Sequence, residues 1–262
     1  MSDILTTCEQ AARSGGAVLL DWVGRFSVRE KGPSDLVTQA DEAAQDAIQR
    51  VVLTSYPNHG FVGEEQKLRQ NAEAEYCWYV DPLDGTTNYV HQVPHYCTSV
   101  AVAKAGQVVA AAIFDPVSRE CYLAKRGGGA FCNGKRLRTS ATKELSQSLV
   151  AASFSSQVDA DSVEIDQFVR ALLLCQAVRR TGSAALNMCY IAAGRFDCFW
   201  ALTTKSWDVA AGSLLIEEAG GVVTHWSGEP FDLDRPHPAA SATPELHQHF
   251  LALLASAKPR RE

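Results

Sequence analysis

The 262-residue chain has no apolar run long enough to cross a bilayer, since even its longest apolar stretches, such as 108–114, are much shorter than a membrane span. Its first residues, Met1-Ser2-Asp3-Ile4, contain no basic patch followed by an apolar run, so no secretory signal is visible. It also lacks an excess of positive charge, because 24 Lys and Arg stand against 30 Asp and Glu. We therefore expect a cytoplasmic protein with no membrane partner and no general affinity for nucleic acid.

Several common site motifs are missing as well. The eight cysteines include no C-x-x-C pair, which excludes a zinc site of that spacing, so we expect reduced, buried cysteines. No G-x-x-x-x-G-K-[S/T] loop occurs, which excludes a P-loop kinase. The D-x-D-x-T motif of phosphatases with an aspartyl nucleophile is absent, because Asp81 and Asp84 are three residues apart. The glycine-rich segment 127–129 lies between two expected hairpin strands and predicts a turn.

Hydrophobic periodicity predicts helices and a strand meander in the first half of the chain, and alternation of strands and helices in the second. A capping box at Thr38 and Asp41 marks the start of one helix. The expected helices are 1–25, 38–55, 165–178, 183–193 and 208–219. The expected strands are 61–62, 76–80, 97–103, 108–114, 121–124, 129–132, 149–154, 196–201 and 222–224. This order favours an α/β architecture in which helices and sheets form layers.

Three short acidic segments carry most of the functional information: 63–65, 81–88 and 207–212. Each places a carboxylate at the end of a strand or the start of a helix, where α/β folds build active sites, although any one of them alone is also typical of an ordinary turn. The backbone N–H groups after Asp84 stand at an expected helix start, which binds phosphate. Carboxylates with a backbone carbonyl suit Mg²⁺ or Mn²⁺. Together these groups indicate hydrolysis of a phosphoester by metal-activated water.

The same segments resemble the signatures of the inositol monophosphatase family, namely Gly63-Glu64-Glu65, the run from Asp81 to His91, and Trp207 to Gly212. Supporting similarity lies at 35–41, 129–134, 182–187 and 218–222. The resemblance implies a five-layer α-β-α-β-α sandwich of the inositol monophosphatase and sugar phosphatase type. It implies a single domain over 1–262, with lobes of about 1–145 and 146–262, and a lithium-sensitive homodimer.

Roles for individual residues also follow from this resemblance. Two or three Mg²⁺ ions, with Mn²⁺ as an alternative, would be held by Glu64, Asp81, the carbonyl of Leu83, Asp84 and Asp208. The catalytic residues would be Asp41, Glu64 and Thr86, with Asp41 and Thr86 orienting and deprotonating the attacking water. The alternative for Asp41 is that it only completes the capping box. The substrate-binding residues would be Glu64, Leu83, Asp84, Gly85, Thr86, Gly182, Ser183, Ala184 and Asp208.

The chain departs from the family pattern at two positions. Inositol-preferring members carry a glutamate seven residues before the Trp-Asp aspartate, and here that position is Ala201, beside Trp200. Trp200 would either form an aromatic wall of the pocket or face the core. Lys31 lies near a lysine that the family uses, but its spacing to Asp35 differs by one residue.

We expect a phosphatase of a small phosphorylated metabolite, namely inositol monophosphate or a related sugar or polyol phosphate. The alternatives are a histidinol-phosphate or nucleotide 3′-phosphatase of the same family, and a metal-binding regulator without turnover.

Overall fold

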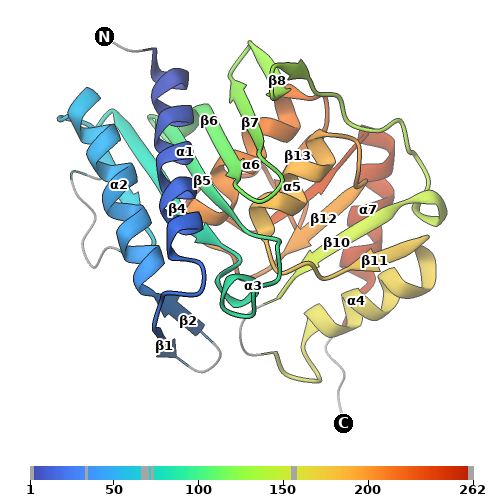
Figure 1. Cartoon of the computed structure of the whole chain (residues 1–262). Helices are drawn as coiled ribbons and strands as arrows, with labels where there is room; N and C mark the ends of the chain where they lie inside the picture. Colours follow the sequence, from blue (N-terminus) through green and yellow to red (C-terminus); the bar gives the residue numbers. More distant parts are fainter. Residues whose placement is uncertain (1–2, 33–34, 66–70, 72–73, 155–157, 259–262) are drawn as a thin grey trace.

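Two β-sheets, one of seven strands and one of five, organise the fold (Figure 1). The computed structural model describes residues 3–32, 35–65, 71, 74–154 and 158–258; the side chains of residues 30–32 and 35 are outside this description. The larger sheet has the order β3-β4-β5-β6-β7-β8-β9. Its strands are β3 Gly60–Gly63, β4 Tyr76–Asp84, β5 Cys97–Lys104, β6 Gln107–Asp115, β7 Glu120–Lys125, β8 Gly129–Cys132 and β9 Lys135–Arg136.

The smaller sheet has the order β11-β10-β12-β14-β13 and is mixed, because β10 is parallel to β11 and β12 while β14 is antiparallel to its neighbours. Its strands are β10 Leu149–Ser153, β11 Ala177–Arg179, β12 Cys198–Ala201, β13 Val222–His225 and β14 Pro238–Ser241. A short hairpin of β1 Val28–Gly32 and β2 Asp35–Thr38 leads from the first helix to the second.

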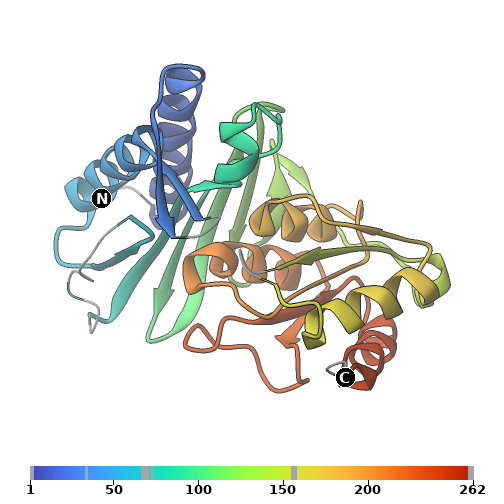
Figure 2. The same ribbon diagram turned by 90° about the horizontal axis from the view of Figure 1, so that it is seen from below.

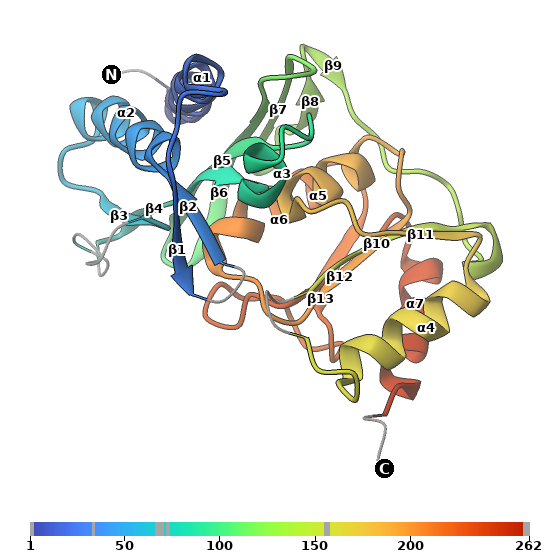
Figure 3. The same cartoon turned by 60° about the horizontal axis from the view of Figure 1, so that its bottom comes forward.

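Helices complete five layers in the order α-β-α-β-α, as predicted (Figure 3). One outer layer holds α1 Ile4–Trp22 and α2 Gln39–Ser55, and the other holds α4 Val163–Leu174 and α7 Pro244–Ser256. Between the two sheets lie α5 Ala184–Ala192 and α6 Ser206–Glu218, with the short α3 Thr86–Val90 at the edge. Figure 2 shows the outer pair α1 and α2 on the far side of the larger sheet from this middle layer.

The sequence of the middle helices explains their position, because both are apolar or small on nearly every side. In α5 and α6 almost all residues are buried, and Leu186, Met188, Leu214 and Ile216 belong to the core between the sheets. Gly212 permits the two helices to approach, since a Cβ there would lie 2.6 Å from the Cβ of Met188. A helix enclosed by two sheets has no wide polar face, because burying such a face would cost free energy.

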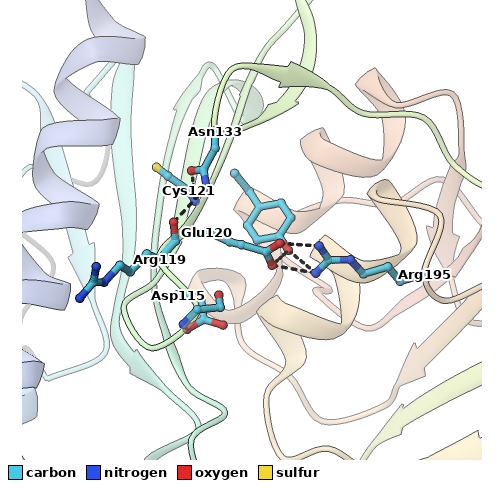
Figure 4. Close-up of polar contacts among 8 residues, drawn as sticks. Asp115, Arg119, Glu120, Cys121, Asn133 and Arg195 are labelled. Atoms are coloured by element: carbon cyan, nitrogen blue, oxygen red, sulfur yellow. Dashed lines mark hydrogen bonds and ion pairs between the residues drawn. The ribbon is translucent and has the colours of Figure 1, made fainter.

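An ion pair joins the two halves of the chain beside this middle layer (Figure 4). The guanidinium of Arg195, which follows α5, donates to both carboxylate oxygens of Glu120 at the start of β7. The Tyr122 hydroxyl lies 2.6 Å from Glu120 Oε2 and 3.0 Å from Arg195 Nη1. This planar pairing of a guanidinium with a carboxylate fixes the end of α5 against the larger sheet.

Most expected elements are present, with shifted bounds. The helix expected over 165–178 is wrong at its end, because α4 stops at Leu174 and residues 177–179 form β11, a parallel partner of β10. The strand expected over 76–80 continues to Asp84. None of the predicted elements corresponds to β14 or α7. The predicted turn is present at 126–128, and Gly129 already begins β8. The N–H groups of Gly127 and Gly129 each donate to Glu218 at 2.7 Å.

The cysteines are reduced as predicted, since all eight are free thiols, six of them buried. No helix in the described ranges has both the length and the apolarity needed to span a membrane.

Buried His247 on α7 makes the stability of the smaller sheet depend on pH. Its ring nitrogens each lie 3.0 Å from a hydroxyl, of Thr224 and of Ser241, and burial lowers its pKa from 6.5 to about 4. The unfolded chain therefore binds a proton at pH values where the folded chain does not. This stabilisation is complete above pH 6.5 and is lost as the pH falls towards 4.

We expect the free energy of unfolding to fall by up to about 3 kcal/mol between these two pH values because of this histidine. Replacing His247 by Gln should flatten that dependence in urea unfolding curves measured from pH 7 to 4. His249→Gln, at an exposed position on the same helix, is the matched control and should keep the wild-type slope. If the free energy of unfolding depends on pH equally steeply in the wild type and in His247→Gln, His247 is not the source of this dependence.

Candidate active site

Asp41 and Thr86 come together although 45 residues separate them in the chain. Asp41 completes the predicted capping box of α2, because its Oδ2 accepts from the Thr38 N–H at 2.9 Å and from the Thr38 hydroxyl at 2.6 Å. Its other oxygen, Oδ1, lies 3.3 Å from the Thr86 hydroxyl. The capping role and the contact with Thr86 therefore coexist. Burial, followed by the nearby charge of Glu64, raises the pKa of Asp41 to about 6.

The end of β4 leaves regular pairing where the acidic motif begins. The register with β5 shifts between Asp81 and Asp84, because Pro82 has no N–H to give to the ladder. Asp81 Oδ1 accepts from the N–H of Leu83 at 2.9 Å, and the Leu83 carbonyl lies 3.1 Å from the Thr86 hydroxyl. Gly85 follows with φ +99°, a left-handed conformation that glycine adopts without strain, and turns the chain into α3.

Asp84 faces the start of α5. Its Oδ2 accepts from the Ser183 hydroxyl at 2.6 Å and from the Ala185 N–H at 2.6 Å, and its Oδ1 accepts from the Ala184 N–H at 3.3 Å. Burial raises the pKa of Asp84 to about 6, and these three donors oppose the rise. Two of the expected substrate-binding residues, Ser183 and Ala184, are therefore in contact with an expected metal ligand.

Glu64 and Asp208 approach the same place from other elements. Glu64 follows β3, and its N–H donates to the carbonyl of Val80 on β4 at 3.1 Å. Asp208 lies in the first turn of α6, and its Oδ2 accepts from the Lys205 N–H at 2.8 Å. Burial, then the charges of Glu64 and the other aspartates, raises the pKa of both Asp81 and Asp208 well above the usual range.

These carboxylates influence one another electrostatically, but they are not arranged around a common point as metal ligands are. Each of Asp81, Asp84 and Asp208 turns an oxygen to a backbone N–H. Across the ranges that the structure describes, no three acidic, histidine or cysteine side chains already surround one point where a metal ion could sit. The donor set nevertheless fits a hard divalent cation, since buried oxygen ligands that repel one another gain most from a positive charge between them.

Two further residues, to which the sequence analysis gave no role, support this cluster. Gln45 on α2 accepts from the Glu65 N–H at 2.9 Å and fills the space beside Gly63, where a Cβ would lie 2.3 Å from Gln45 Oε1. Asn88 donates to the carbonyl of Thr181 at 2.9 Å and packs on Gly182. Gln45 stands four residues after Asp41, so helical spacing was the signal that could have found it.

Two expectations near the pocket have a definite outcome. Trp200 is fully buried and packs on Phe250 of α7 with ring centroids 5.9 Å apart, so it belongs to the core and the aromatic-wall alternative is wrong. Ala201, its neighbour, is also fully buried but on the opposite face of β12, in the core around α5 and α6. The side chain of Lys31 lies outside the described residues.

The chain belongs to the inositol monophosphatase family, whose model matches residues 1–258. It is 38% identical to Nus factor SuhB of Pseudomonas aeruginosa, over 99% of this chain and 97% of that protein. It is 39% identical to the inositol-1-monophosphatase of Rhizobium meliloti, over 92% of this chain and 90% of that protein.

Solved structures agree with this membership. The extragenic suppressor protein suhB of Bartonella henselae superposes with a TM-score of 0.91 at 33% identity, and covers 97% of this chain and 98% of its own. An IMPase/NADP phosphatase complexed with Mg²⁺ and phosphate superposes with a TM-score of 0.83 at 25% identity, over 94% of this chain and 93% of its own. The fold of this chain is therefore of the inositol monophosphatase type, and a member of the family binds Mg²⁺.

The repulsion among the carboxylates predicts a test of the cluster. Asp81→Asn keeps the oxygen that accepts from Leu83 and removes one buried charge, so it should raise the free energy of unfolding in EDTA by about 1 to 3 kcal/mol. It should also reduce the stabilisation that added Mg²⁺ gives to the wild type. Thermal and urea unfolding with and without Mg²⁺ measure both effects.

Asp197→Asn is the control, because Asp197 is a buried aspartate that accepts from the Leu149 N–H, away from the cluster. It should lose stability and keep the wild-type response to Mg²⁺. An Asp81→Asn protein that is less stable in EDTA and still stabilised by Mg²⁺ as fully as the wild type would refute the cluster.

Proposed function

We propose that this chain is a Mg²⁺-dependent phosphatase of small phosphomonoesters, and that water attacks phosphorus directly. The observation that carries the proposal is the group of acids Glu64, Asp84 and Asp208, whose charges act on the buried Asp81, together with the Asp41–Thr86 contact. With divalent cations bound, a cluster of this kind beside a helix start would suit an anionic substrate, because the cations would neutralise its charge. Membership of the inositol monophosphatase family supports the same chemistry.

Glu64, Asp81, the Leu83 carbonyl, Asp84 and Asp208 would hold the divalent cations. Bound there, the cations would supply charge neutralisation for the phosphate and for the departing oxygen. The N–H groups of Gly85 and Thr86 would bind the phosphate oxygens at the start of α3.

The Asp41–Thr86 pair would remove the proton from the attacking water. Thr86 Oγ1 lies between the Asp41 carboxylate and the Leu83 carbonyl, so it can accept from a water and pass a proton to Asp41. A pKa of about 6 suits a general base that acts near neutral pH. The bond from water oxygen to phosphorus forms as the ester bond breaks, and the leaving alkoxide takes a proton from solvent. The products are inorganic phosphate and an alcohol.

The substrate class is a small sugar, polyol or related phosphate, with inositol monophosphate among the candidates. Ala201 replaces the glutamate that would bind a polyol hydroxyl, and such a charge-assisted hydrogen bond contributes roughly 1.5–3 kcal/mol. We therefore infer a preference for inositol weaker than that of members with the glutamate. Lithium inhibition and a homodimer are part of the same proposal.

The enzyme proposal predicts that Asp84→Asn lowers kcat by at least about 100-fold with the fold retained. Phosphate release from a panel of inositol, sugar, histidinol and nucleotide phosphates with Mg²⁺ measures the loss, and circular dichroism checks the fold. Asp166→Asn on α4, whose carboxylate pairs with Arg170, is the control and should keep full activity. No phosphate release by the wild type from any ester of the panel would refute the proposal.

A second candidate is a regulator that keeps the fold and acts by binding. A relative that is 38% identical over 99% of this chain is named Nus factor SuhB, which favours this alternative. The same variant separates the two functions. A regulatory role predicts that Asp84→Asn retains its function in cells, whereas an enzymatic role predicts that it is lost together with turnover.

A further inference from the structure

A hollow of about 630 Å³ lies at the opposite end of β4 from the acidic cluster. Tyr76, the first residue of β4, lines it, whereas Asp84 ends the same strand, so roughly 25 Å of extended chain separates them. In Figure 1 the first turn of α1 and the last turn of α2 lie at this end of the molecule, away from α3. The volume is typical of a small-molecule site, and the mechanism proposed above makes no use of it.

A stack of three rings forms one wall of this hollow. His59 lies between Tyr56, with ring centroids 4.6 Å apart and planes at 22°, and Tyr76, with centroids 4.9 Å apart and planes at 9°. Packing on Trp78 behind the stack fixes the rings in place. Both faces of His59 are covered in this stack, and Lys104 Nζ lies over the Tyr76 ring, 5.3 Å from its centroid, so the wall offers mainly ring edges. A flat ligand can lie against such edges in the edge-to-face arrangement that aromatic rings adopt.

The proton of His59 has a defined position. The indole N–H of Trp78 lies 3.1 Å from His59 Nδ1, and an indole nitrogen can only donate. Nδ1 must therefore accept, so the neutral ring carries its proton on Nε2. Burial lowers the pKa of His59, which keeps the ring neutral near pH 7. His59 thus offers an N–H donor at Nε2 and cannot bind a metal through Nδ1 without losing the Trp78 bond.

Two adjacent cations line the same hollow. Arg126 is held by hydrogen bonds from Nε to the Val108 carbonyl at 2.7 Å and from Nη2 to Glu217 at 2.9 Å, and a guanidinium carries more donors than these bonds use. Lys125 pairs with Asp3 at 3.1 Å, and both side chains are about half exposed. An exposed pair of this kind contributes little, so Lys125 can exchange Asp3 for a more highly charged anion.

We propose that this hollow binds a nucleoside phosphate, either as a free nucleotide or as one nucleotide of an RNA. The base lies against the ring edges of Tyr56, His59 and Tyr76, and an acceptor atom of the base accepts a hydrogen bond from the N–H at His59 Nε2. The phosphate lies at Lys125 and Arg126. Since this site and the acidic cluster share no residue, the proposal is independent of the phosphatase function.

The test is calorimetric titration of the full chain in EDTA with AMP, adenosine, inorganic phosphate and a short oligoribonucleotide. Omitting Mg²⁺ stops hydrolysis and leaves the acidic cluster repelling phosphate. We expect saturable binding of AMP that is tighter than that of adenosine or phosphate alone. Tyr76→Leu should weaken it about fivefold through the lost edge-to-face contact, and Lys125→Ala about tenfold through the lost charge-assisted bond.

Lys143→Ala is the matched control, because Lys143 is an exposed lysine in an ion pair with Glu245 elsewhere on the surface. It should bind AMP as the wild type does, and all three variants should keep wild-type phosphatase activity with Mg²⁺. Tighter binding of the oligoribonucleotide, weakened by the same two variants, identifies RNA as the source; equal or weaker binding identifies the free nucleotide. The proposal is overturned if neither ligand saturates, or if Lys125→Ala, an exposed change that leaves the core intact, binds as the wild type does.

Discussion

The repulsion among buried carboxylates at the end of β4 is the constraint that shapes the site. Asp81 and Asp208 have pKa values well above the usual range because burial and neighbouring acids penalise their charged forms. Backbone hydrogen bonds offset part of the free-energy cost of these charges. The N–H groups of Leu83, Ala185 and Lys205 each donate to one of the aspartates. A donor of this kind stabilises a carboxylate without adding a competing side chain.

The middle layer of the sandwich explains why the acids meet where they do. The first turns of α5 and α6 both face the cluster, since Asp84 accepts from the start of α5 and Asp208 lies in the first turn of α6. Helix starts carry partial positive charge, so the layer that fills the space between the sheets also moderates the repulsion. Because α5 and α6 pack between the sheets through their apolar sides, their N-terminal ends point towards the site. The same two helices therefore fill the core and stabilise the carboxylates.

Local signals predicted much of the fold and of the site. The capping box of Thr38 and Asp41, the turn after β7 and the apolar middle helices could be read from adjacent residues, because the interactions involved are short-range. The end of α4 could not, since residues 177–179 leave the helix to pair with β10. The spacing of Gln45 from Asp41 placed it on the right face of α2, but its contact could not be predicted, because its partner Glu65 lies 20 residues away.

Ala201 shows how the charge balance of the site bears on substrate choice. It is fully buried on the face of β12 towards α5 and α6, and the strand continues into the segment that carries Asp208. A glutamate at this position would be a buried charge, and burying it would cost free energy unless a ligand hydroxyl or a cation paired with it. With alanine the chain avoids that cost and gives up that hydrogen bond. For the phosphatase proposed above, alanine predicts that recognition of the alcohol part of the substrate depends on shape and on the groups at the start of α5, and therefore predicts a broader range of phosphate esters than a single polyol.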